Sequence, residues 1–269
     1  MHTRQNPNLD RLSILIAIIL LAYASARFIN LPAREYTLQL PGLLLSLRVN
    51  VNTLVAVLVA SITAAGADWL VRDHPALRTE RTIQHWFLPS LTAMVLGFPL
   101  STLPLGLPWW GVYSIGGISI VLVLVAEYII IDPDDIRQPA AVAGLTALSF
   151  ALFFILSYSL RAIQARLLFT FPALFITSYL VSIRTLHLRH FGRWEISRSL
   201  IVALIVGQVG AALHYFPLSA MSYGLILFGL VYATTSLIDN LLQEIPFPQS
   251  LVEPGLILLI VLLLAYFLR

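Results

Sequence analysis

Long apolar runs alternate with short polar segments along the whole 269-residue chain. A run of eighteen or more apolar residues is long enough to cross a hydrocarbon core of about 30 Å. The pattern predicts about nine transmembrane helices, at roughly residues 12–29, 52–71, 86–108, 110–131, 139–160, 167–186, 199–215, 219–238 and 252–268. The third run is the weakest, because Pro99, Pro104 and Pro108 interrupt it. The predicted fold class is therefore all-α: a polytopic transmembrane helical bundle in which residues 1–269 form a single integral membrane domain.

The first run has two interpretations. It follows a polar segment with Arg4 and Arg11, and it precedes Ala24-Ser25-Ala26, a small-residue pattern typical of signal-peptide cleavage sites. A multi-pass protein can also use its first helix as the targeting signal. Because further apolar runs follow, we expect an uncleaved first helix.

A different periodicity lies between the first two runs, in residues 35–51. Apolar positions Leu45, Leu47, Val49 and Val51 alternate there with Leu44, Ser46, Arg48 and Asn50, and Pro41-Gly42 interrupts the segment. Alternation with period two around a turn dipeptide is typical of a β-hairpin. We expect a short hairpin at the membrane surface, and a longer, tilted second helix is the alternative.

Composition excludes several classes of protein. The chain is 59% hydrophobic and only 11% charged, with a mean hydropathy of +0.88, whereas soluble domains are about a quarter charged. There is no Cys, so disulfides and thiolate metal sites are excluded. The net charge of +3 comes from Arg, without Lys, in short loops. That distribution follows the positive-inside rule, so we expect a lipid bilayer and no nucleic acid as partner.

The placement of Arg predicts the orientation. With nine spans and the N-terminus in the cytoplasm, ten Arg residues lie inside and six outside. The inner ones are Arg4, Arg11, Arg72, Arg78, Arg81, Arg137, Arg184, Arg189, Arg193 and Arg198. We therefore predict a multi-pass protein of the inner (plasma) membrane of a bacterial-type cell, with a cytoplasmic N-terminus and the C-terminus outside. Losing one weak span would reverse every later segment.

A short internal echo suggests duplication. Phe98-Pro99-Leu100-Ser101 recurs as Phe216-Pro217-Leu218-Ser219, and both copies are expected at an outer turn between two helices. Two four-helix repeats would then occupy 12–135 and 139–240, followed by an extra helix at 252–268. Apolar sequences also agree by chance, so an unrelated pair of halves is the alternative.

Glu127 is the acid placed most firmly inside an apolar run. At helical spacing Tyr113, Gly116 and Ile120 fall on its face, which indicates the protein interior rather than lipid. An acid within a membrane is a functional candidate by default, because it can carry a proton or bind a cation. The alternative is a polar anchor, because Glu127 lies close to the predicted inner end of its helix.

Asp68 has a similar predicted depth in the second helix. Arg72 follows it by four residues, in the favourable order for a helical ion pair. A pocket shared by Asp68 and Glu127 would instead raise the pKa of one acid, as a proton carrier requires. Asp68, Glu127, Arg72 and Tyr113 are thus the candidate intramembrane polar site. For this helix we also expect a small-residue packing face of Ser61, Ala64, Ala65 and Asp68.

Other polar clusters favour structural roles. Asp132 to Asp135 could bind a hard cation, but a turn before the next helix explains them better. His187, His190 and Glu195 resemble metal ligands, but Arg184, Arg189 and Arg193 surround them and would repel a cation. The sequence has no phosphate-binding glycine loop, HExxH or GxSxG motif. We predict no catalytic residue, no metal and no cofactor.

Two functional hypotheses remain for this membrane protein. The first is a non-catalytic subunit or scaffold of a membrane complex, with membrane-protein partners or a homo-oligomer; the scarcity of buried charge favours it. The alternative is a small transporter or channel with a polar pathway near Asp68 and Glu127. We expect no enzyme, because no nucleophile–base or metal set is visible.

Overall fold

The computed structural model describes residues 7–26, 28, 34–40, 43–49, 51–75, 77, 82–190 and 193–268. The chain divides into two compact units, Met1–Ala141 and Val142–Arg269. Unit 1 contains α1 (Leu9–Ala26), β1 (Arg34–Leu40), β2 (Leu43–Val49), α2 (Val51–Val71), the 3₁₀ helix η1 (Thr82–His85), α3 (Phe87–Thr102) and α4 (Leu107–Ile129). The next helices are α5 (Gln138–Ala162), α6 (Leu167–Arg189), α7 (Ile196–Leu213), α8 (Ala220–Leu242), α9 (Phe247–Ser250) and α10 (Val252–Phe267).

The helical bundle predicted from the sequence is confirmed. Eight helical segments of the described chain are long and apolar enough to cross a membrane. They are α1, most of α2, α4 to α8, and the segment Phe247–Phe267, which consists of α9 and α10 together. The third predicted span, α3, is a helix of 16 residues and is shorter than these. Pro104 and Gly106 lie between α3 and α4, which is why the third apolar run ends early.

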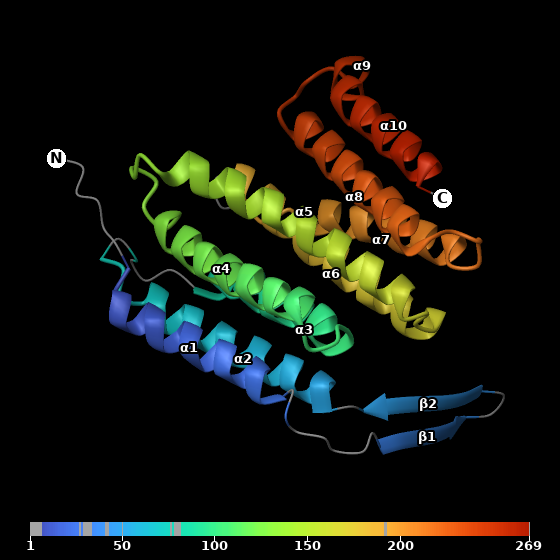
Figure 1. The fold of residues 1–269 in the computed structure, drawn as a ribbon. Coiled ribbons are helices and arrows are strands. Elements are labelled where there is room, and N and C mark those ends of the chain that lie inside the picture. The colour runs from blue at the N-terminus through green and yellow to red at the C-terminus, as the bar shows by residue number, and fades with distance from the viewer. Residues whose placement is uncertain are drawn as a thin grey trace. The chain divides into compact units, whose positions relative to one another are not determined.

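In unit 1, the helices α1, α2, α3 and α4 run antiparallel, each to the next of these four along the chain (Figure 1). At one end Arg11 of α1 forms an ion pair with Asp73, just after α2, with an N–O distance of 2.6 Å. At the other end Trp109 Nε1 of α4 donates to the carbonyl of Leu100 in α3 at 3.1 Å. Between them, the Tyr23 hydroxyl of α1 donates to the Ala93 carbonyl of α3. The last two contacts place α3 beside both α1 and α4.

The apolar core of unit 1 corrects one prediction for α2. Ser61 and Ala65 are exposed, so the packing face is not the one expected from Ser61, Ala64, Ala65 and Asp68. The buried face contains Val59, Thr63, Gly66, Ala67 and Leu70. A Cβ on Gly66 would lie 2.1 Å from Leu15 Cδ1 of α1. The absence of a side chain there lets the two helices approach closely.

A β-hairpin joins α1 to α2, as the alternation in residues 35–51 predicts. Strands β1 and β2 pair antiparallel with Tyr36 opposite Leu47 and Leu38 opposite Leu45. Helix α2 starts at Val51, directly after the hairpin. The alternative of a longer second helix that includes this segment is therefore wrong.

Polar side chains connect the helices of unit 2. Arg161 near the end of α5 donates to the carbonyls of His214 and Phe216, both at 2.6 Å, in the connection between α7 and α8. The Tyr223 hydroxyl of α8 donates to the Gly210 carbonyl of α7 at 3.0 Å. The Ser222 hydroxyl donates to the Ala265 carbonyl of α10 at 2.9 Å, so the start of α8 lies beside the end of α10.

The two copies of the internal echo lie in different local structures. Phe98 to Ser101 are helical residues near the end of α3, whereas Phe216 to Ser219 lie in the connection between α7 and α8. The expectation of an outer turn for both copies is therefore wrong for the first. Duplication of two four-helix repeats stays a prediction.

Candidate functional site

Three elements of unit 1 meet at the end where α2 and α4 finish. Asp68 lies three residues before the last residue of α2, and Glu127 lies two before the last of α4. Both acids contact the 3₁₀ helix η1, which supplies a hydrogen-bonding partner to each of them. The similar depth predicted for the two acids thus corresponds to a common neighbour.

Asp68 is held by side chains on both sides of the α2–α3 connection. Its Oδ2 forms the predicted ion pair with Arg72 Nε at 2.8 Å. Its Oδ1 accepts hydrogen bonds from Thr82 Oγ1 at 2.5 Å and from Trp86 Nε1 at 3.2 Å. Asp68 therefore anchors the start of α3 to the end of α2.

Glu127 lies in the interior with a histidine as its partner. His85 Nδ1 and Glu127 Oε2 are 2.7 Å apart, and the two side chains are 4% and 1% exposed. A buried carboxylate requires such a partner, because its desolvation is otherwise costly. The contact ties the end of α4 to η1.

Each of the two acids therefore contacts a different residue of η1. The predicted pocket shared by Asp68 and Glu127 corresponds in the structure to two separate polar contacts on one short helix. Thr82 and His85 are three residues apart, one turn of a 3₁₀ helix.

Tyr113 belongs to the other end of unit 1, which corrects its placement in the candidate site. Its hydroxyl donates to the carbonyl of Leu20 in α1 at 2.9 Å. Its ring stacks on that of Trp109, with 5.0 Å between centroids. Fourteen residues of α-helix, about 21 Å of rise, separate Tyr113 from Glu127. A shared helix face therefore did not mean a shared site.

Sequence reasoning missed His85, Thr82 and Trp86. Thr82 and His85 belong to η1 and Trp86 directly precedes α3, whereas the sequence predicts only that a helix begins near Trp86. A usable signal was present: the start of the third span lies at the same membrane end as Asp68 and Glu127. An imidazole there has ring nitrogens that can form hydrogen bonds with a carboxylate.

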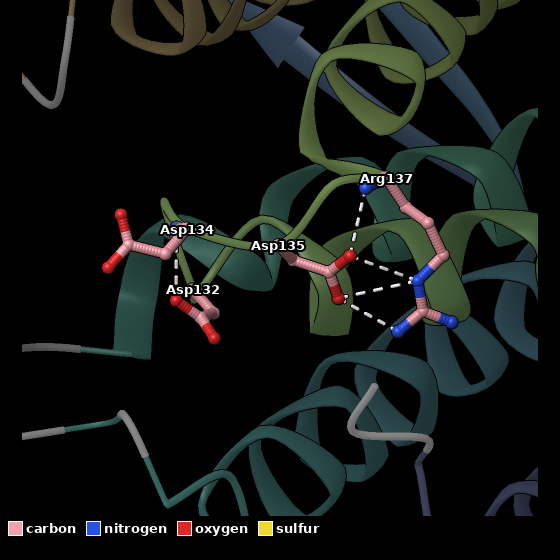
Figure 2. A network of polar contacts seen from close by, with 4 residues as sticks. All are labelled: Asp132, Asp134, Asp135 and Arg137. Carbon is pink, nitrogen blue, oxygen red and sulfur yellow. Dashed lines mark hydrogen bonds and ion pairs between the residues drawn. The ribbon is translucent and has the colours of Figure 1, made fainter. Parts of the chain in front are cut away.

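The acidic loop after α4 is a turn, as predicted (Figure 2). The Asp134 amide donates to Asp132 Oδ1 at 3.1 Å. Asp135 binds Arg137 through both carboxylate oxygens, with 2.8 Å between Asp135 Oδ2 and Arg137 Nη2. Hydrogen bonds from Arg137 to the Asp135 carboxylate raise the pKa of Arg137, because they stabilise the charged guanidinium. The cation that the Asp135 carboxylate binds is therefore the Arg137 guanidinium of the same chain.

Close to this loop, His74 is buried between α2 and η1. Its ring meets that of Tyr128 edge to face, with 4.5 Å between centroids. Burial lowers the pKa of His74, while the charges of Asp132 and Asp135 oppose that shift. The neutral imidazole is therefore favoured.

Unit 2 contains its own carboxylate–histidine contact. Asp239, three residues before the end of α8, accepts from Arg189 Nη1 at 2.5 Å and from His190 Nε2 at 2.8 Å. Glu195 pairs instead with Arg198, and the His187 ring lies 4.4 Å from that of Trp194. His187, His190 and Glu195 therefore do not form a common metal site. Within the described chain, no group of three metal-ligating residues is present.

The chemistry available at these contacts is hydrogen bonding and charge compensation. Asp68, Glu127 and Asp239 are each held by a cationic or hydrogen-bonding side chain. An imidazole beside a carboxylate can also hold a proton, which keeps a second interpretation open for His85 and Glu127.

Comparison with known proteins identifies a family. The model of the family described as "Protein of unknown function (DUF5656)" matches residues 31–268, most of the chain. No curated protein and no solved structure matches.

Proposed function

We propose, for a chain that belongs to the DUF5656 family of proteins of unknown function, that it is a non-catalytic subunit or scaffold of a membrane complex. The chain is a membrane protein with several helices suited to spanning a bilayer. The proposed partners are other membrane proteins or further copies of the chain, and the proposed location is the inner (plasma) membrane with the N-terminus in the cytoplasm.

The observation that carries this proposal is where the acids of the apolar helices lie. Asp68, Glu127 and Asp239 each lie within three residues of a helix end. Each is held by a partner on its own helix or on an adjoining element. A polar pathway requires polar groups along the middle of facing helices, whereas polar groups at helix ends fix the packing of helices.

The middle of α4 has the apolar character that a scaffold requires. Ile120, Val123 and Leu124 are each 1% exposed. A Cβ on Gly116 would lie 2.9 Å from Leu96 Cδ2, so α3 and α4 pack closely at this level. Close apolar packing supports a dry interior.

Thiol labelling tests the proposal, because the chain has no Cys to remove. Ile120→Cys and Leu124→Cys probe the interior of α4, and Asp134→Cys in the exposed loop is the positive control. A membrane-impermeant maleimide should label Asp134→Cys and leave both interior positions unlabelled from either side. Labelling of Ile120→Cys or Leu124→Cys would reveal a water-filled cavity and would contradict the proposal that the chain is a scaffold.

A small transporter or channel is the second candidate, and the contact between His85 and Glu127 favours it. A buried imidazole–carboxylate pair is a known arrangement for holding a proton within a membrane. In this hypothesis the pathway runs near Asp68 and Glu127. Reconstituted protein would then move protons or a cation, and the Glu127→Gln variant would abolish that movement.

A further inference from the structure

The hairpin between α1 and α2 has two faces of different polarity. Neighbouring residues of a strand lie on opposite faces, and residues directly opposite in a register share a face. With Leu38 opposite Leu45 and Thr37 opposite Ser46, the register separates apolar from polar positions. One face, called here the apolar face, contains Tyr36, Leu38, Leu40, Leu43, Leu45, Leu47 and Val49, with Arg34 at its edge. The other, the polar face, contains Glu35, Thr37, Gln39, Leu44, Ser46 and Arg48.

The apolar face needs a cover to be stable. An isolated two-stranded hairpin is marginal in water, because it cannot bury enough apolar surface. Removing Leu and Val side chains from water is favourable, and this face carries five Leu residues and one Val. Whatever covers it therefore also stabilises the hairpin.

The hairpin continues directly into membrane-spanning helices. Val49, the last residue of β2, precedes the first residue of α2 by two positions. Arg34, the first residue of β1, follows the last residue of α1 by eight positions. Since α1 and most of α2 are suited to crossing the bilayer, both ends of the hairpin are fixed near its surface. Seven residues of strand extend about 23 Å, a length that can lie along that surface.

The charges of the hairpin agree with a membrane surface as partner. Glu35 and Arg48 occupy opposite register positions on the polar face, and opposite charges at such positions are favourable. The apolar face includes Tyr36, and Tyr is enriched at the headgroup level of membranes.

We propose that β1 and β2 form an interfacial membrane anchor whose partner is the lipid surface. The apolar face rests in the boundary between headgroups and acyl chains, and the polar face is in contact with water. The anchor fixes the ends of α1 and α2 at one membrane surface, and it does not depend on the role proposed for the whole chain.

Site-directed spin labelling of the full-length protein in phosphatidylcholine vesicles tests this proposal. Single cysteines are introduced at Leu45→Cys and Leu47→Cys on the apolar face, with Ser46→Cys and Thr37→Cys as controls on the polar face. Collision of the label with oxygen, which concentrates in lipid, is compared with collision with a water-soluble nickel chelate. We expect a several-fold higher oxygen-to-nickel ratio at Leu45 and Leu47 than at Ser46 and Thr37.

Two outcomes would overturn the anchor. Nickel access at all four positions would place the hairpin in water. Low access to both reagents at Leu45 and Leu47 would mean that protein covers the apolar face, and magnetic coupling between labels on different molecules would then identify a second copy of the chain. Because each variant carries a single label, its folding is checked by its own circular dichroism spectrum, and only variants with the helical content of the wild type are compared.

Discussion

His85 is a hydrogen-bonding partner of the buried Glu127. Removing one partner of a buried pair leaves the other desolvated, so we expect the His85→Ala and Glu127→Ala variants each to be destabilised. In a double-mutant cycle their coupling should be about 0.5–3 kcal/mol. The measurement is unfolding in mixed micelles. The control is the pair Glu195 and Arg198, whose side chains are 20% and 47% exposed, with an expected coupling of about 0.2–1 kcal/mol. Equal coupling in both pairs would contradict a structural role for His85.

His74 gives unit 1 a defined sensitivity to acid. Its pKa is lowered by burial from the ordinary 6.5, so the unfolded chain binds a proton more readily than the folded one. The stability contributed by neutral His74 is therefore present above the ordinary pKa and is lost as pH falls below it. We expect the His74→Gln variant to lose less thermal stability than the wild type between about pH 7.5 and 5.5.

The measurement for His74 is the melting temperature in detergent at both pH values. His214→Gln is the comparison, because burial and the charge of Arg161 also lower the pKa of His214. His214 is only half-buried, so its variant should change the acid sensitivity less. An identical loss of stability in the wild type and the His74→Gln variant would exclude His74 as the cause.

At the scale of elements, glycine determines how closely α2 and α3 approach. A Cβ on Gly97 would lie 2.9 Å from Ala56 Cβ, which cannot rotate away. Overpacking of this kind costs about 1–3 kcal/mol. We therefore expect the Gly97→Ala variant to unfold at lower denaturant. At Gly111 in α4 nothing lies within 4 Å of an added Cβ, so Gly111→Ala should be neutral or stabilising by up to about 1 kcal/mol. A neutral Gly97→Ala would show that the helices separate easily there.

Helices and hairpin were predictable from the sequence because each follows from a local pattern. Apolar run length located the long helices, and alternation in residues 35–51 located the hairpin.

The candidate site was less predictable, because it depends on contacts between elements. Asp68 and Arg72 are four residues apart at the end of α2, and this helical spacing predicts their ion pair. His85 and Glu127 are 42 residues apart, and no local pattern connects them. Tyr113 was grouped with Glu127 by helical spacing, which gives the face of a helix but not the depth along it.

For the whole molecule, the direction of α3 decides the orientation of every later helix. Helix α3 has 16 residues and η1 has four, and together they rise about 30 Å, the thickness of a hydrocarbon core. The contact of His85 with Glu127 places η1 beside the end of α4, and the contact of Leu100 with Trp109 places the end of α3 beside the start of α4. A segment held at both ends of α4 favours a full crossing, and hence nine spans.

Four single cysteines can test this topology. Pro75 precedes α3, Leu105 follows it, Asp134 lies between α4 and α5, and Ile163 follows α5. If α3 crosses, an impermeant thiol reagent added to intact cells should label Leu105→Cys and Ile163→Cys. Pro75→Cys and Asp134→Cys should react only after the membrane is opened, because the positive-inside rule places their Arg-containing loops in the cytoplasm. Labelling of Pro75 and Leu105 from the same side would show that α3 does not cross. The later Arg-rich segment from Arg184 to Arg198 would then lie outside, against the charge asymmetry on which the orientation rests.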